Sequence, residues 1–217
     1  MRTQVICCGP PRADAMRIVL LPGAYHALAD FVGAGFDQAL RNRGLAAELI
    51  LAAPELAHLG DRSWLARLQS EVIAPARERA GGALWLGGIS LGGFMALRFA
   101  AESHAGIDGL CLLAPYLGSR IVAAEVAAHA SLADWQPADL AEDDDDRRVW
   151  RLVQRLGAAG APRVFLGYGS EDRFADTQQL LARALPAGST RVIPGGHDWP
   201  VWRALWDNFL DQLGSRP

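Results

Sequence analysis

The chain lacks any apolar run long enough to span a membrane, and it carries little net charge. In 217 residues the formal net charge is −3, and no cluster of basic residues is long enough to suggest a nucleic-acid surface. A membrane-spanning helix needs about 20 apolar residues, and the longest apolar runs are far shorter. We therefore expect neither a membrane nor a nucleic acid as a partner, while the composition leaves the oligomeric state open.

Cysteine is also scarce. Of the three cysteines, Cys7 and Cys8 are adjacent and Cys111 lies in an apolar run. Adjacent cysteines rarely pair with each other, so we expect three reduced thiols and a cytoplasmic location. No second group of cysteines and histidines complements Cys7 and Cys8, which argues against a metal site. Residues 1–11 contain one basic residue and too short an apolar stretch for a secretory signal.

The chain does contain a regular alternation of short apolar runs and longer helical patterns. With 51% hydrophobic and 21% charged residues, the segment 1–217 can form one domain with a sizeable core. The predicted strands cover 17–21, 45–50, 83–86, 109–113, 163–168 and 190–193, with a further strand at 3–8. The predicted helices cover 27–43, 61–79, 91–103, 174–185 and 198–213. This alternation indicates an α/β fold, with a mostly parallel sheet of about six or seven strands and helices on both faces.

The segment 118–160 interrupts this alternation. It is rich in alanine and helical in pattern, and we interpret it as a helical insertion that can act as a lid. It contains the acidic run 142–146, which Arg147 and Arg148 follow. Acidic residues interact favourably with the positive end of a helix, so the run is interpreted as the solvated start of a helix. A divalent-cation site is the alternative, but the spacing of an EF-hand loop is missing.

The most informative motif is the run 87–93, GGISLGG, between an apolar strand pattern and a helical pattern. A strand, a G-x-S-x-G sequence and a helix form the context of a nucleophile elbow, in which Ser90 occupies a sharp, strained turn. Gly88 and Gly92 let the strand and the helix approach closely. At the helix start, the Leu91 N–H would face a developing negative charge. The alternative is a glycine-rich turn in which Ser90 only caps the helix.

A serine hydroxyl needs a base within hydrogen-bond reach, and the base needs a third group to orient it. Only His197 follows a predicted strand near the end of the chain, in a loop that contains two glycines. A histidine that is only structural is the alternative interpretation. The other histidines are predicted in loops or on helix surfaces: His26, His58, His104 and His129.

The acidic partner is expected after the strand predicted at 163–168. Asp172 and Glu171 both qualify by position, whereas the loop 114–119 after the preceding strand has no carboxylate. We prefer Asp172, whose role would be to accept the His197 Nδ1–H. Glu171 is the main competitor, and an Asp172 that only caps the next helix is the other alternative. Asp198 adjoins His197 and is predicted to cap the last helix.

The order Ser90, Asp172, His197 is the serine–acid–histidine order of α/β-hydrolases. Over about 17–213, the chain resembles the α/β-hydrolase superfamily, in particular its small bacterial serine esterases. The run 195–199, GGHDW, is similar to that of esterases whose final histidine precedes an aromatic-rich helix. The resemblance implies an α/β-hydrolase fold with at most one antiparallel strand ahead of the first parallel one. The tryptophans at helical spacing are expected to pack in the core: Trp199, Trp202 and Trp206.

This resemblance implies a serine hydrolase that cleaves a carboxylic ester of a small molecule through an acyl-enzyme on Ser90, with no cofactor or metal. It also implies a second oxyanion donor after the first hydrolase strand, the N–H of Ala24, or of Tyr25 if the loop is shifted. Many relatives have His-Gly where this chain has Pro22 and Gly23. A thioesterase or amidase would use the same machinery, and a catalytically silent hydrolase-fold binding protein is the alternative from another class.

Two loop tyrosines, Tyr25 and Tyr116, are expected at the same sheet edge, where they would narrow the substrate pocket. In the insertion, Trp135 and Trp150 either fold against the mouth of the site or pack inside the insertion. A short insertion over a small domain leaves limited room beside Ser90. The sequence therefore predicts a preference for short acyl chains.

Overall fold

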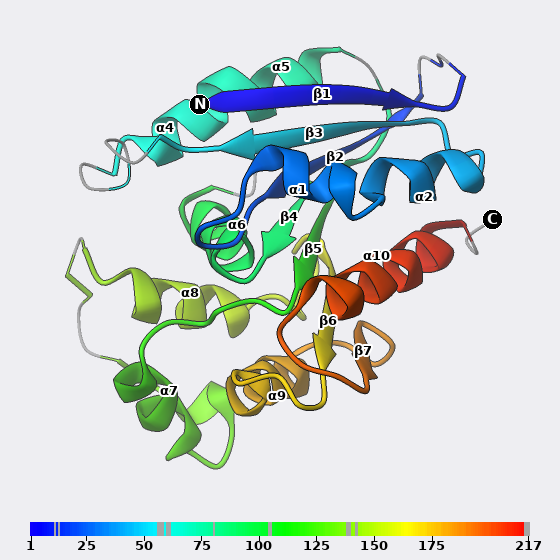
Figure 1. The fold of residues 1–217 in the computed structure, drawn as a ribbon. Coiled ribbons are helices and arrows are strands. Elements are labelled where there is room, and N and C mark those ends of the chain that lie inside the picture. The colour runs from blue at the N-terminus through cyan, green and yellow to red at the C-terminus, as the bar shows by residue number, and fades with distance from the viewer. Residues whose placement is uncertain are drawn as a thin grey trace.

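The computed structural model describes residues 1–10, 12, 14–55, 59, 62–79, 81–103, 106–137, 140–141 and 143–214. Within this part of the chain, seven strands form one sheet in the spatial order β1-β3-β2-β4-β5-β6-β7 (Figure 1). The strands are β1 (Arg2–Cys8), β2 (Met16–Leu21), β3 (Ala47–Ala53), β4 (Leu84–Ile89), β5 (Gly109–Leu113), β6 (Arg163–Gly169) and β7 (Thr190–Ile193).

The sheet is parallel except at one edge. β1 pairs antiparallel with β3, and the other neighbouring strands run parallel. The central strands β4 and β5 are buried along their whole length, as strands covered on both faces are. The predicted α/β fold with a mostly parallel sheet of six or seven strands is confirmed, and β1 is the antiparallel strand that the resemblance allowed.

Helices cover both faces of the sheet, and each layer closes its own hydrophobic core. On β2, Ile18 and Leu20 point into one core while Val19 and Leu21 point into the other. One face is covered by α1 (Leu28–Gly33), α2 (Phe36–Asn42) and α10 (Trp199–Gly214). The other is covered by α4 (Trp64–Leu68), η1 (Gln69–Ile73), α5 (Ala74–Glu78), α6 (Leu91–Glu102), α8 (Asp145–Val153) and α9 (Ala175–Ala184).

Two predicted helices are interrupted. The helix predicted over 27–43 is split into α1 and α2 because Gly35 adopts a left-handed conformation with φ of 76°. The helix predicted over 61–79 contains a π-helical turn, η1, immediately before Pro75 in the first turn of α5. Proline has no N–H for the helical ladder, and a wider turn is one way to accommodate it.

The insertion contributes α7 (Arg120–Ala127), the short turn η2 (Leu132–Asp134) and α8 between β5 and β6. The prediction that the acidic run starts a helix is confirmed, because α8 begins at Asp145 and the Asp144 side chain caps it. The run is partly solvated, since Asp143 is exposed and residues 144–146 are half-buried. Asp145 Oδ1 binds Arg98 Nε at 2.5 Å, and Asp146 Oδ2 accepts the N–H of Ser119 at 2.7 Å. The Asp145 carboxylate anchors the insertion to α6, whereas the Asp146 carboxylate joins the start of α8 to the start of α7 within the insertion.

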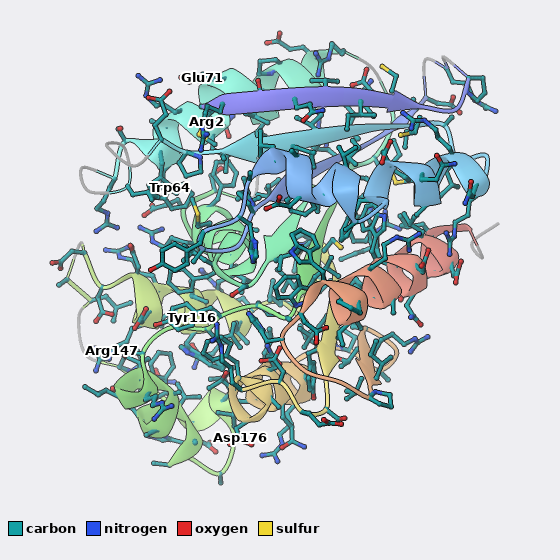
Figure 2. All side chains as sticks on the ribbon, in the orientation of Figure 1. Arg2, Trp64, Glu71, Tyr116, Arg147 and Asp176 are labelled. Carbon is teal, nitrogen blue, oxygen red and sulfur yellow. The ribbon has the colours of Figure 1, made fainter. Side chains whose placement is uncertain are left out.

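The two tryptophans of the insertion are buried in the core that the insertion shares with the rest of the protein. Trp135 is 1% exposed and Trp150 is fully buried, and both belong to the core that α6 closes. Their ring N–H groups donate to Glu125 and to the carbonyl of Leu117. Glu125 also pairs with Arg147, which Figure 2 labels on this part of the molecule. Trp135 and Trp150 therefore do not fold against the mouth of the site.

Cys7, Cys8 and Cys111 are free thiols. Cys7 is exposed and Cys8 is buried, because successive side chains of a strand point to opposite faces. This geometry explains why the adjacent pair forms no disulfide. None of the described helices is both long and apolar enough to cross a lipid bilayer.

Candidate active site

Ser90 lies on the turn between β4 and α6. Its backbone has φ of 53° and ψ of −114°, which an L-residue rarely adopts. The turn is held by hydrogen bonds from the Ser90 N–H to Leu113 O at 3.0 Å and from the Tyr116 N–H to Ser90 O at 3.0 Å. The predicted strand, sharp turn and helix are thus all present, and the strained turn carries the serine.

Glycine is needed on both sides of Ser90 because backbone segments cross there. A Cβ atom on Gly88 would lie 2.5 Å from Leu21 O and 2.6 Å from the carbonyl carbon of Gly92. A Cβ atom on Gly92 would collide with the same Leu21 carbonyl. Any side chain at either position would push β4, α6 and β2 apart.

His197 lies in the loop between β7 and α10. Its Nε2 is 2.9 Å from Ser90 Oγ, and its Nδ1 is 2.7 Å from Asp172 Oδ2. The loop turns at Gly195, which has φ of 118° and lies directly against Gly169 at the end of β6. Hence the loops after β4, β6 and β7 meet at the carboxyl edge of the sheet and bring the three predicted side chains together.

Asp172 is buried, with 5% of its surface exposed. Its Oδ1 accepts the Phe174 N–H at 2.8 Å while its Oδ2 faces His197. Burial raises the pKa of the Asp172 carboxyl, but the hydrogen bonds from His197 and from the Phe174 N–H outweigh burial. The pKa of Asp172 therefore lies below its ordinary value, and the carboxylate form is favoured.

The neighbouring carboxylates take other places. Glu171 is exposed, and its own N–H donates to Gly195 O at 2.9 Å. Asp198 Oδ1 accepts the Val201 N–H at 3.1 Å, so the prediction that Asp198 caps the last helix is confirmed. Of the three acids near His197, the structure brings Asp172 against its ring.

The other described histidines, His26 and His129, form different contacts. His26 packs edge-on against Trp199 and Trp202, and His129 is exposed just after α7. His58 and His104 fall outside the described residues.

Two backbone N–H groups are the candidates for binding an oxyanion. Leu91 is the first residue of α6, and an N–H in the first turn of a helix has no partner within the helix. The loop after β2 passes directly beside the elbow, because a Cβ atom on Gly23 would lie 3.5 Å from Ser90 Cβ. Ala24 follows in an exposed turn, closed by the His26 N–H donating to Gly23 O.

The two tyrosines predicted near the pocket differ. Tyr25 is fully exposed at φ of 66°, so its side chain forms no wall of a pocket, and this prediction does not agree with the structure. The left-handed backbone of that turn directs the ring into solvent. Tyr116 is half-buried, and its ring lies 5.5 Å from that of Phe94 and 5.6 Å from that of Phe174. Burial raises the pKa of the Tyr116 hydroxyl.

Around the triad, Phe174 and Gln178 were not singled out from the sequence, and Trp202 was singled out only as a core residue. The rings of Phe174 and Trp202 pack edge-on against the imidazole, with centroids 5.2 Å and 5.0 Å away. Gln178 of α9 is fully buried, donates to Pro115 O at 3.2 Å and helps to lower the pKa of Asp172. The helical spacing of Trp202 predicted burial, which is confirmed at 3% exposure, but not contact with His197.

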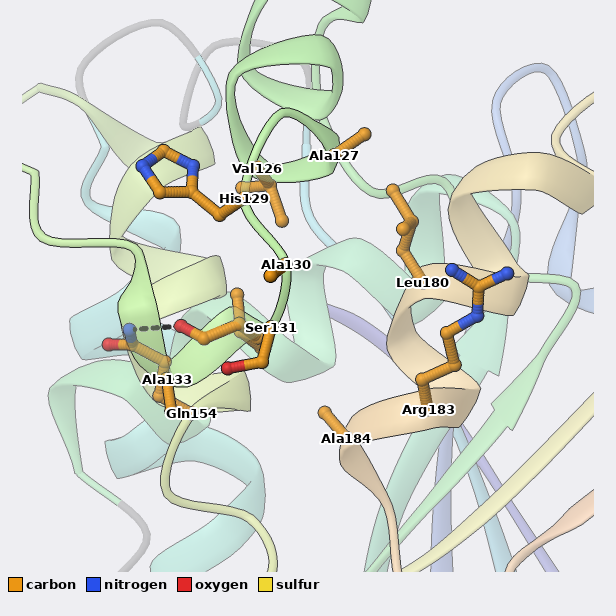
Figure 3. Close-up of a pocket in the computed structure, with 11 residues that line it drawn as sticks. Val126, Ala127, His129, Ala130, Ser131, Ala133, Gln154, Leu180, Arg183 and Ala184 are labelled. Atoms are coloured by element: carbon orange, nitrogen blue, oxygen red, sulfur yellow. Dashed lines mark hydrogen bonds between the residues drawn. The ribbon is translucent and has the colours of Figure 1, made fainter.

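A cavity of about 370 Å³ lies between the end of α7, η2 and α9 (Figure 3). Its lining includes His129, Leu180 and Arg183, and none of the residues that meet at the elbow. Within the described residues, no group of three or more histidine, cysteine or acidic side chains is placed to hold a metal ion.

The comparison with solved structures identifies the fold. No family model matches the chain, and no curated protein matches it. Among solved structures, it is similar to Est1E from Butyrivibrio proteoclasticus, with 14% identity, a TM-score of 0.66, and 98% of this chain and 94% of that one covered. It is also similar to the monoacylglycerol lipase of Paleococcus ferrophilus (16% identity, TM-score 0.61, 98% of each chain).

A third similar structure is an S-formylglutathione hydrolase from Agrobacterium tumefaciens, with 16% identity, a TM-score of 0.59, and 99% of this chain and 89% of that one covered. The likeness extends over nearly the whole of each chain. The chain has the α/β-hydrolase fold.

Proposed function

We propose that the protein is a serine hydrolase that cleaves a carboxylic ester of a small molecule through an acyl-enzyme on Ser90. The observation that carries this proposal is the hydrogen-bonded chain from Ser90 Oγ through His197 to Asp172, set on a strained turn. Such a chain is what a weakly nucleophilic hydroxyl requires at neutral pH. The similar structure named a monoacylglycerol lipase supports the same class.

In this proposal each residue has a role. Ser90 Oγ bonds to the acyl carbon while His197 Nε2 takes the hydroxyl proton, and Asp172 stabilises the imidazolium that forms. The N–H groups of Leu91 and Ala24 would donate to the oxyanion of the tetrahedral intermediate. His197 then returns the proton to the leaving alcohol. A water molecule, deprotonated by His197, next attacks the acyl carbon. The bond to Ser90 Oγ then breaks, His197 gives the proton to Oγ, and the acid is released.

Thioester cleavage is the second candidate. One of the similar structures is named an S-formylglutathione hydrolase, and the leaving group of that substrate is a thiol. The same three residues would serve, with the proton from His197 going to the thiolate. A series of matched esters, thioesters and amides separates these candidates by kcat/KM.

A fluorophosphonate probe tests the proposal directly, because it phosphonylates an activated serine. We expect wild-type protein to be labelled once and Ser90→Ala not at all, with a fall in ester turnover of roughly 10⁴-fold or more. Ser103→Ala is the matched control, since Ser103 caps the opposite end of α6 and is exposed. Labelling of Ser90→Ala would overturn the proposal, and an unlabelled wild-type protein would indicate a silent binding protein.

We also propose that the protein works in the cytoplasm on a small-molecule substrate. The free thiols of Cys7, Cys8 and Cys111 support this location, because secreted proteins usually oxidise their cysteines. Fractionation of cells that express the protein checks it.

A further inference from the structure

A second cavity, away from Ser90, is lined by four arginines. It has a volume of about 310 Å³ and lies between α6 and α8. Ala101 at its edge is eleven residues after Ser90 on α6, hence about 16 Å along the helix from the elbow. The lining arginines are Arg98, Arg148, Arg151 and Arg155.

The first of these arginines is buried, with 1% of its surface exposed. Arg98 Nε donates to Asp145 at 2.5 Å and its Nη2 donates to Glu102 at 2.5 Å. Its Nη1 is buried and has no hydrogen-bond partner. A buried donor without an acceptor is costly, and an anion in the cavity would supply the acceptor.

The other three arginines differ from Arg98 in their partners. Within the described residues, Arg148, Arg151 and Arg155 form no ion pair with a carboxylate. Arg148 donates only to the carbonyl of Ala141, at 3.3 Å. Positions 148, 151 and 155 follow helical spacing, so the three cations lie on one side of α8 and its continuation, where like charges repel.

The charge of the cavity therefore calls for an anion. Among the described residues that line the cavity or bind Arg98, there are four guanidinium groups and two carboxylates, an excess of two positive charges. Arg148 also contributes to lowering the pKa of Glu102, after the hydrogen bond from Arg98. The chain as a whole has a net charge of −3, so the excess is local.

We propose that this arginine pocket binds a phosphorylated small molecule through its phosphoryl group. Guanidinium groups match the oxygens of a phosphoryl group in pairs, and a dianion would balance the excess charge. A concave cavity of about 310 Å³ suits a small ligand rather than the extended backbone of a nucleic acid. This inference does not depend on the activity proposed for Ser90.

The probe for the test is inorganic pyrophosphate, titrated calorimetrically into the full chain at low ionic strength. We expect one binding site, and we expect Arg151→Gln with Arg155→Gln to weaken binding at least tenfold. The matched control is Arg2→Gln with Arg191→Gln, which removes the same charge from β1 and β7 and changes affinity less than twofold. Figure 2 labels Arg2 on β1, far from α8.

Several outcomes would overturn the proposal. These are no binding of pyrophosphate, equal weakening by the control pair, and equal affinity for citrate, which has negative charge but no phosphoryl group. Thermal unfolding without ligand separates binding from a structural role. Because Arg151 and Arg155 repel their neighbours, we expect the pocket variant to melt at or above the wild-type temperature. A lower melting temperature with unchanged pyrophosphate affinity would assign these arginines to stability instead.

Discussion

Gly88 and Gly92 touch across the elbow: a Cβ atom on Gly88 would lie 2.6 Å from the carbonyl carbon of Gly92. Both glycines also abut the carbonyl of Leu21 on β2. The turn at Ser90 can therefore form only because Gly88 before it and Gly92 after it both lack side chains. The sharp turn also directs the Ser90 hydroxyl toward His197 rather than into the core.

Gly88→Ala is expected to lower the free energy of unfolding by about 3 kcal/mol, because its neighbours are backbone atoms that cannot move aside. Gly33→Ala is the matched control, since nothing lies within 4 Å of a Cβ atom there. That variant should change stability by less than about 1 kcal/mol. Urea denaturation measures both, and equal effects would contradict the close packing of the elbow.

Asp172→Asn should reduce kcat/KM for an ester by roughly 10⁴-fold, because an amide favours the wrong tautomer of His197 and cannot balance its charge. Glu171→Gln should leave kcat/KM within about threefold of wild type, since Glu171 is exposed. Steady-state kinetics on both variants checks the assignment. A crippled Glu171→Gln enzyme with an active Asp172→Asn enzyme would show that the acid is misassigned.

The lowered pKa of Asp172 predicts how stability changes with pH. A carboxyl whose pKa is lower in the folded than in the unfolded chain stabilises the fold above its unfolded pKa, about 4. This contribution is lost as the pH falls through the lower, folded pKa. Wild type should exceed Asp172→Asn in stability by about 2 kcal/mol at neutral pH, and the difference should shrink below about pH 4. Urea denaturation from pH 7 to pH 3 measures it; a difference that grows on acidification would refute the sign.

The aromatic row beside His197 predicts a preference for short acyl chains. The ring of Tyr116 packs between those of Phe94 and Phe174, and the Phe174 ring packs against the imidazole of His197. In a p-nitrophenyl ester series from acetate to palmitate, kcat/KM should fall with chain length. A long apolar groove would instead add about 0.8 kcal/mol per buried methylene, so a steady rise to palmitate would reject this prediction.

Two tyrosine variants locate the cause of that preference. Tyr116→Ala removes a wall of the row and should shift the optimum toward longer chains. Tyr25→Ala should leave the chain-length profile unchanged, because Tyr25 is fully exposed. If only the Tyr25 variant shifted the optimum, the loop after β2, and not the aromatic row, would limit the length of the acyl chain.

The sequence by itself determined the features that depend on neighbours along the chain. The strand–turn–helix at Ser90, the alternation of strands and helices, the start of α8 and the cap at Asp198 were all predicted because local periodicity and turn chemistry specify them. Ser90, Asp172 and His197 each follow a predicted parallel strand. Because parallel strands end at the same edge of a sheet, the sequence predicted that their three loops meet there.

Only the tertiary structure decided between residues that the sequence leaves equivalent. Asp172 and Glu171 are adjacent, but the Phe174 N–H and the His197 ring meet Asp172 while Glu171 faces solvent. Likewise Tyr116 packs between two rings and Tyr25 packs against nothing. Arg98 meets Asp145 across 47 positions of chain. Such contacts depend on which distant segments of the chain pack against one another, and local sequence patterns carry no information about that packing.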